Sequence, residues 1–239
     1  RCDIEGGNAM ELIAYLQRSI YMNLIYEDRY QLILSGLWVT LLLTVVSFVL
    51  GTVLGMAFCA GKGSRNRVIR GFSNGITALM VKLPPLVLLM IFAYLILADT
   101  SFSAEVISII TFTLKCASHL SEMFRSAVDS VAVGEIEAAR TLGYSRWQAF
   151  FQVVFPQARH QVMPLYKTQF VLTMQDTSVV SLLAVQDMTR AVTVITSRTM
   201  DPIISLVITS VVYLLLGFVA NRMLSLADRN KHLECKEVV

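Results

Sequence analysis

Charged and amide side chains interrupt two long apolar segments of this sequence, and their spacing places them on shared helix faces. Lys115, His119 and Glu122 follow one another at i, i+4 and i+7, so in a helix they lie on one side. Gln169 and Asp176 are seven residues apart and also share a face. Because charges inside membrane spans are costly, they usually mark functional sites. These residues therefore suggest a binding site in which Asp176 pairs with the ammonium group of a small ligand.

Each of these residues also has a purely structural interpretation. Asp176 could cap or hydrogen-bond neighbouring backbone at a helix break. Lys115 could bind a ligand carboxylate, form a structural pair with Glu122 or Asp176, or extend its ammonium group toward the membrane surface. A lone histidine such as His119 is more often an interface residue than a ligand. The sequence leaves these alternatives open.

The elements that hold these side chains are predicted to be membrane helices. The chain has 239 residues, of which 55% are hydrophobic and 15% charged, whereas soluble domains average about 25% charged residues. A span needs about 20 apolar residues, and stretches of this kind predict an all-α integral membrane protein with a transmembrane domain over 30–225. The five predicted spans cover about 32–60, 76–98, 104–125, 164–187 and 202–222.

The distribution of Lys and Arg predicts the orientation of these spans. Thirteen of the 20 basic residues fall in segments 62–70, 122–167 and 222–236, which are cytoplasmic if the N-terminus is outside, and five fall in the segments on the opposite side. Because basic residues concentrate on the cytoplasmic side, we expect an outside N-terminus and a cytoplasmic C-terminus. The loop 126–163 and the tail 226–239 are then cytoplasmic. Segment 1–29 is extracytoplasmic, and its residues 11–29 form an amphipathic interfacial helix or simply extend the first span.

Several classes of function are disfavoured by the same sequence. The four cysteines, Cys2, Cys59, Cys116 and Cys235, have no metal-ligand spacing, so neither a metal site nor a disulfide framework is predicted. The basic residues form no basic and aromatic patch, which argues against nucleic-acid binding. The stretch GKGS at 61–64 lacks the Walker A pattern. We therefore expect no cofactor, nucleotide site or catalytic residue in this chain.

The stretch EIEAARTLGYSRWQAFFQVVFPQA, residues 135–158, is a charged interruption in this apolar chain. A short helix is predicted over 134–142, with acidic residues in its first turn and Arg140 later, as the helix dipole favours. Gly143 should end it in a left-handed conformation, Ser145 should cap a second helix, and Pro156 should mark another break. On physical grounds the stretch is either a compact cytoplasmic knob or a connecting loop that lies on the membrane.

The spacing within this stretch resembles a known family. Glu137-Ala138-Ala139, three residues, Gly143, nine residues and Val153-x-Phe155-Pro156 are similar to the EAA loop of bacterial ABC importer permeases. The resemblance implies the type I importer architecture, in which this loop forms a coupling helix that docks in a groove of the ATPase subunit. It implies a dimer with a second permease chain, the same or different, and two partner ATPase subunits that bind ATP and Mg²⁺. The implied ATPase-coupling residues are Gly134, Glu135, Glu137, Ala138, Ala139, Arg140, Leu142, Gly143 and Pro156.

Further stretches narrow the resemblance to the polar amino acid permease branch. Residues 120–125, LSEMFR, and 176–181, DTSVVS, are similar to that branch. The family places Gln169 and Asp176 in a central cavity, often with Glu at the first position, so the Gln argues against a site dedicated to Arg or Lys. The implied substrate-binding residues are Gln169, Asp176, Thr177, Lys115, Glu122 and Pro85. The resemblance also implies an extracytoplasmic substrate-binding protein, or a binding domain fused ahead of Arg1.

Two features depart from the family pattern. Lys115 stands where the family usually has a neutral polar residue, and the stretch Lys82-Leu83-Pro84-Pro85 replaces a Gly-Thr-Pro turn in which only Pro85 fits. A rival interpretation is a stand-alone protein, either an ion-coupled secondary transporter or a membrane sensor. The sequence shows neither the inverted repeat common in such transporters nor a soluble output domain.

Overall fold

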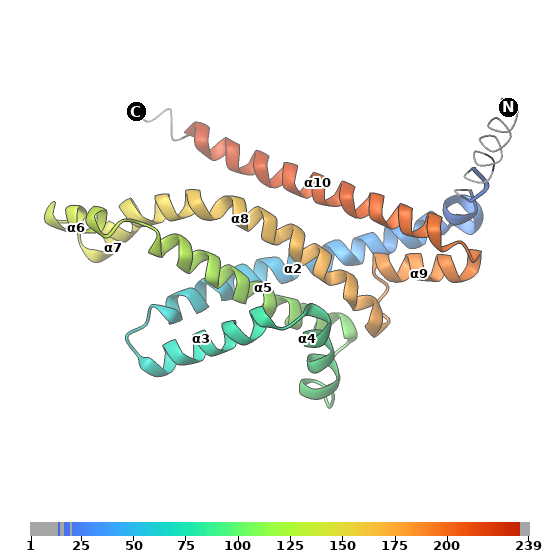
Figure 1. The fold of residues 1–239 in the computed structure, drawn as a ribbon, viewed down its shortest axis with the longest axis horizontal. Helices are drawn as coiled ribbons and strands as arrows, with labels where there is room; N and C mark the ends of the chain where they lie inside the picture. Colours follow the sequence, from blue (N-terminus) through green and yellow to red (C-terminus); the bar gives the residue numbers. More distant parts are fainter. Residues whose placement is uncertain (1–13, 15–16, 20, 235–239) are drawn as a thin grey trace, which may run out of the picture. The chain divides into compact units, whose positions relative to one another are not determined.

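A computed structural model describes residues 14, 17–19 and 21–234, and every regular element in that part of the chain is helical (Figure 1). The all-α prediction is therefore confirmed for the described residues. The amphipathic helix predicted over 11–29 lies partly outside them. In chain order the elements are η1 (Tyr21–Ile25), η2 (Tyr26–Asp28), α2 (Arg29–Lys62), α3 (Arg67–Lys82), α4 (Pro85–Ile91), η3 (Phe92–Ile96), α5 (Ala104–Asp129), α6 (Val133–Thr141), α7 (Arg146–Ala149), η4 (Phe150–Val154), α8 (Phe155–Asp176), η5 (Thr177–Leu183), α9 (Met188–Thr199) and α10 (Pro202–Glu234).

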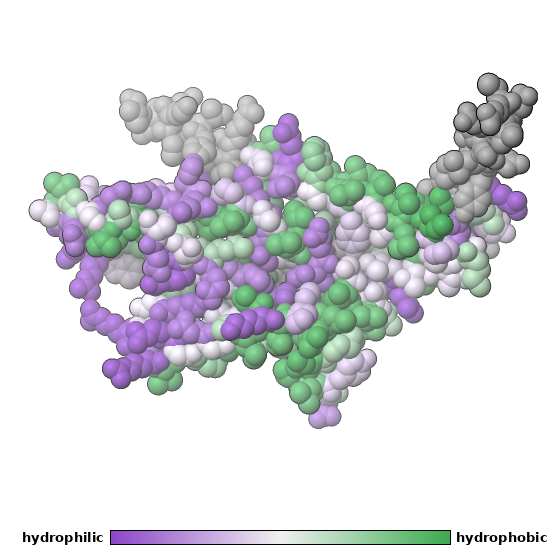
Figure 2. Space-filling model, viewed as in Figure 1, coloured by the Kyte–Doolittle hydropathy of each residue, from purple (hydrophilic) through white to green (hydrophobic). Residues whose placement is uncertain are grey.

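Two helices within the described residues are long and apolar enough to cross a membrane unaided, namely α2 and the Pro202–Leu226 part of α10. Two bent helix pairs raise that number to as many as four. Figure 2 shows apolar surface along α10 and on α4, in keeping with exposed side chains such as Leu214 and Phe218. The structure thus supports an integral membrane protein of apolar helices.

The second predicted span, 76–98, is not one straight helix. Helix α3 ends at Lys82, and the segment Pro85–Ile96 leaves it at an angle of 117°. The reason is local: neither Pro84 nor Pro85 has an amide hydrogen, and a proline disfavours helical backbone in the residue before it. Helix α3 also begins before residue 76, because the Asn66 side chain accepts a hydrogen bond from the Val68 amide and caps it there.

Helix α8 begins and ends earlier than the predicted span, 164–187. It begins at Phe155, continues through Pro164 and ends at Asp176, where the 3-10 helix η5 follows. The break predicted at Pro156 is wrong: Pro156 lies in the first turn of α8, directly after the π-helix η4, and the chain stays helical through it. Residues 146–183 are therefore continuously helical.

The structure divides into two units, each described here by itself. The larger covers residues 43–177 and 220–239, and in it α5 and α8 lie side by side (Figure 1). A buried cluster of Phe48, Cys116 and Leu120 joins α2 to α5. A β-carbon built at Gly55 of α2 lies 2.9 Å from the Ala117 carbonyl oxygen of α5, so only glycine allows the two backbones to approach this closely.

Helix α3 packs against α5 with its polar side inward. Ser73 and Thr77 are buried, and the Thr77 hydroxyl donates to the Ser73 carbonyl at 2.9 Å. Val68 and Phe72 on the same helix are 76% and 64% exposed. This is the reverse of a soluble amphipathic helix, and it fits an outer face that contacts lipid.

The smaller unit covers residues 1–42 and 178–219. Buried Asp187 caps α9 by accepting hydrogen bonds from the Thr189 and Arg190 amides at 3.2 and 2.8 Å. Helix α2 approaches this cap so closely that a β-carbon at Gly36 would lie 2.7 Å from the Asp187 carbonyl oxygen. The Met188 amide donates to the Thr40 hydroxyl at 3.2 Å, which fixes α9 on α2.

Candidate functional site

The predicted coupling loop is a helical knob built from α6, α7 and η4. Helix α6 ends as the sequence predicts, because Gly143 has φ +93° and the Tyr144 amide donates back to the Ala139 carbonyl at 3.2 Å. The Arg140 guanidinium also donates to the Tyr144 carbonyl at 2.9 Å. Gly143 and Arg140 thus fix the chain reversal that follows α6.

The second helix of the knob is held by a capping box. The Ser145 hydroxyl accepts from the Gln148 amide at 3.2 Å, and the Gln148 side chain accepts from the Ser145 amide at 2.8 Å. This confirms the cap predicted at Ser145. The Gln157 side chain in the first turn of α8 donates to the Glu135 carboxylate, which ties α8 back to α6. The knob is thereby closed on itself by its own side chains.

The exposed face of α6 is acidic, and of the two neighbouring alanines Ala138 and Ala139 it contains only Ala138. Glu135, Glu137 and Ala138 are exposed, and Leu142 is 80% exposed. Ala139 is buried at 4% exposure, so it packs within the knob. Of the residues that the resemblance implies for coupling, Ala138 and Leu142 therefore lie on the exposed surface of the knob, whereas Ala139 packs inside it. Gly134 is exposed and has open space around it.

An aromatic ridge lies beside this face. Trp147 and Phe151 are 72% and 58% exposed, and their rings stack with centroids 6.1 Å apart. Phe155, at the start of α8, packs against Phe151 with centroids 6.2 Å apart. The knob therefore presents carboxylates, an alanine and an exposed aromatic ridge, a combination suited to contact with another protein.

The predicted substrate residues of α5 and α8 meet in a polar cluster in the larger unit. Gln169 and Thr173 are buried, and the Gln169 amide donates to the Thr173 hydroxyl at 3.4 Å. The Thr173 hydroxyl in turn lies 3.6 Å from the Cys116 sulfur on α5. Asp176, half-buried at the end of α8, lies within electrostatic range of Lys115. The structure thus brings Thr173, the partner of Gln169, against Cys116 of α5, and it brings Asp176 within electrostatic range of Lys115.

Asp176 does not cap a helix. In the part of the chain that the structure describes, its carboxylate accepts no hydrogen bond, so the capping interpretation is not supported. The next residue, Thr177, is fully buried, and its hydroxyl donates to the Met174 carbonyl at 2.7 Å. The Thr177 hydroxyl is therefore satisfied within its own helical turn, and the roles of Thr177 and Asp176 in substrate binding stay predictions.

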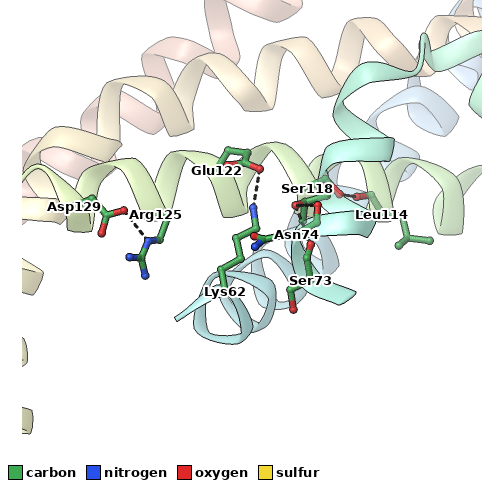
Figure 3. Close-up of polar contacts among 9 residues, drawn as sticks. Lys62, Ser73, Asn74, Leu114, Ser118, Glu122, Arg125 and Asp129 are labelled. Atoms are coloured by element: carbon green, nitrogen blue, oxygen red, sulfur yellow. Dashed lines mark hydrogen bonds and ion pairs between the residues drawn. The ribbon is translucent and has the colours of Figure 1, made fainter. Parts of the chain in front are cut away.

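Lys115 does not pair with Glu122, although both lie on α5. Its ammonium group donates to the Leu83 carbonyl at 3.0 Å, beside the break between α3 and α4. Glu122 instead forms an ion pair with Lys62 of α2, with 2.7 Å between Nζ and Oε1 (Figure 3). Glu122 is thus engaged by Lys62, and its role in substrate binding stays a prediction. His119 lies within electrostatic range of both Lys115 and Glu122.

Pro85 takes the first position of α4, directly after the break that Lys115 reaches. The two departures from the family pattern, Lys115 and the Lys82–Pro85 stretch, are therefore in contact with each other. The cysteines Cys59 and Cys116 are free thiols, as the sequence predicts, while Cys2 and Cys235 lie outside the described residues.

Two kinds of structurally important position lie outside the residues predicted from the sequence. The first kind is the glycines at which helices approach closely, Gly36, Gly51 and Gly55. Gly51 and Gly55 form a GxxxG pattern, which is typical of close helix packing and is visible in the sequence. Lys62, the partner of Glu122, gave no local signal beyond its place at the end of an apolar segment.

Comparisons with known proteins give the same assignment as the loop. The family described as binding-protein-dependent transport system inner membrane component matches residues 47–232. The nopaline transport system permease protein NocM of Agrobacterium fabrum is 27% identical over 217 residues, which cover 85% of this chain and 90% of NocM. The histidine/lysine/arginine/ornithine transport system permease protein HisQ of Escherichia coli is 29% identical over 209 residues, 82% of this chain and 92% of HisQ.

A solved structure supports the fold as well. A chain from a crystal structure of an amino acid ABC transporter with histidines superposes with a TM-score of 0.78 at 25% identity, covering 84% of this chain and 94% of that one. The match of the family over most of the chain, together with the self-closed EAA knob, is decisive. The chain belongs to the family of binding-protein-dependent transport system inner membrane components.

Proposed function

We propose that this chain is the transmembrane permease subunit of an ATP-driven importer for polar amino acids. The knob formed by residues 133–154 carries the proposal, because it presents Glu137 and Ala138 outward at the spacing of the EAA loop. In this scheme the knob docks on a separate ABC ATPase subunit. The assembly contains two such subunits, and they bind ATP and Mg²⁺. Movement of the knob then rocks the helices that surround the substrate.

The proposed assembly contains more than this chain. Two permease chains, identical or different, enclose the path, and an extracytoplasmic binding protein or fused binding domain delivers the amino acid. The chain is placed with five spans, its N-terminus outside and its C-terminus in the cytoplasm. The charge asymmetry supports that orientation. A stand-alone secondary transporter or sensor is not favoured, because the family is a component of binding-protein-dependent systems.

Ala138 and Ala139 offer a matched test of the coupling surface. Ala138→Asp places a charge on the exposed face of α6, so we expect it to weaken ATPase co-purification roughly tenfold or more while the permease still elutes as a folded species. Ala139→Asp buries a carboxylate inside the knob, so it should also expose the loop to protease. Ser101→Asp, an exposed change in the loop before α5 and outside the knob, is the control. ATPase binding by Ala138→Asp at the wild-type level would contradict the coupling surface.

Asp176 provides the matching test of the substrate path. Asp176→Ala removes a half-buried carboxylate that accepts no hydrogen bond from the described residues. We therefore expect amino acid uptake to be lost while the permease and ATPase still co-purify. Glu105→Ala, an exposed acidic residue in the first turn of α5, is the control and should leave uptake unchanged. Uptake by Asp176→Ala at the wild-type rate would refute the placement of the substrate at this carboxylate.

A further inference from the structure

Lys115 is held in place by a helix break rather than by a carboxylate. Its side chain is buried on α5, and its ammonium group donates to the Leu83 carbonyl at 3.0 Å. Leu83 is followed by Pro84 and Pro85, which have no amide hydrogens, so the bend offers few backbone donors to the carbonyls around it. The bend thus provides an acceptor for one N–H of the ammonium group and fixes the position of its charge.

Acidic side chains lie both on α8 and on α5, the helix that contains Lys115. Asp176 lies within electrostatic range, whereas Glu122 on the same helix is occupied by Lys62. Gln169, which is buried on α8 and bonded to Thr173, is uncharged. Lys115 and Asp176 together therefore form an approximately neutral pair, with one positive and one negative charge offered to the same neighbourhood.

We infer that Lys115 is a specificity-determining cation that makes this path reject amino acids with a positively charged side chain. The inference rests on the proposed function. A zwitterionic amino acid with a neutral side chain presents one ammonium group, which Asp176 balances. A cationic side chain adds a second positive charge near Lys115, and no further acidic residue is engaged with the cluster in the described residues.

The magnitude follows from the burial of Lys115. Charges interact more strongly when solvent is excluded, and Lys115 is only 7% exposed. The electric field of the Lys115 ammonium group acts on the cationic side chain of a substrate even when the two groups are not in direct contact. We expect rejection of about 10- to 100-fold relative to an uncharged analogue of the same shape. The chain would then differ in substrate charge from HisQ, whose name specifies histidine, lysine, arginine and ornithine.

The test measures binding to the assembled, detergent-purified transporter without any binding protein, so that the selectivity of a delivery protein does not enter. Arginine and citrulline compete against a labelled neutral amino acid; the two have nearly the same shape and differ in charge. Lysine and norleucine form a second pair. The variants are Lys115→Gln, which keeps a donor for Leu83 and removes the charge, and Lys115→Arg, which keeps the charge. Lys82→Gln, which removes an exposed lysine beside the same bend, is the control.

Wild type, Lys115→Arg and Lys82→Gln are expected to bind citrulline at least tenfold more tightly than arginine, and Lys115→Gln is expected to lose most of that preference. A wild-type transporter that binds arginine as tightly as citrulline overturns the inference without any variant. An unchanged preference in Lys115→Gln overturns it as well. If no amino acid of either charge binds and no ATPase co-purifies, the proposed function itself is wrong.

Discussion

Replacement of Gly36 by alanine tests whether the contact between α2 and the Asp187 cap limits the stability of the smaller unit. A β-carbon at Gly36 would lie 2.7, 2.8 and 2.9 Å from three backbone atoms of Asp187 and Met188. Because backbone atoms cannot rotate away, α2 and the start of α9 must separate. Overpacking of this kind costs about 1–3 kcal/mol, and three backbone contacts place Gly36→Ala at the upper end of that range.

A gain in helix propensity partly offsets this cost. Alanine is favoured over glycine in a helix by about 1 kcal/mol, so the net loss is about 2 kcal/mol. A change of 1 kcal/mol shifts the melting temperature of a protein of this size by about 2–4 °C. We therefore expect Gly36→Ala to melt about 4–8 °C below wild type when unfolding is followed in detergent.

Gly75 on α3 supplies the matched control. A β-carbon at Gly75 meets no atom within 4 Å, so Gly75→Ala keeps the propensity gain without the clash. Its melting temperature should rise by about 2–4 °C. The two substitutions are chemically identical and have opposite predicted signs. If Gly36→Ala melts at or above the wild-type temperature, the close approach of α2 to Asp187 is not a real constraint.

Three further predictions follow from the larger unit. Gly143→Ala forces a side chain into φ +93° and should cost about 1–2 kcal/mol at the knob, seen as faster proteolysis of residues 133–154 with uptake reduced in proportion. Glu122→Gln leaves the buried Lys62 charge without its partner, whereas Lys62→Met leaves only a half-exposed carboxylate that water can solvate; Glu122→Gln should therefore lower the melting temperature more, and the reverse order would contradict the asymmetry. Gly55→Leu should abolish the folded elution peak, because its β-carbon already lies 2.9 Å from the Ala117 carbonyl oxygen.

The coupling knob was the most predictable part of the molecule from sequence. Its helix, its reversal at Gly143 and its cap at Ser145 depend on hydrogen bonds between residues at most five positions apart. Local side-chain chemistry therefore determines them, and the prediction of these features is confirmed. The same local rules gave the wrong result at Pro156, because the chain stays helical through both Pro156 and Pro164.

The ligand cluster was predictable only in part. Helical spacing correctly placed Gln169 and Asp176 on one helix, α8. It could not show that Lys115 reaches Leu83, 32 residues away, or that Glu122 pairs with Lys62, 60 residues away. Those partners depend on how helices pack. The sequence also could not show which of Ala138 and Ala139 faces outward. Both side chains are equally small, and only the fold of the knob buries Ala139.

The knob that closes on itself has a consequence for protein engineering. Its reversal, its capping box and its tie from Glu135 to Gln157 all lie between Val133 and Gln157. A segment whose contacts are internal retains its shape when it is moved, provided that the two flanking helices keep their spacing. We therefore expect residues 133–157, the proposed coupling segment, to be exchangeable between permeases. An exchange would transfer the choice of ATPase subunit without a change in the membrane path.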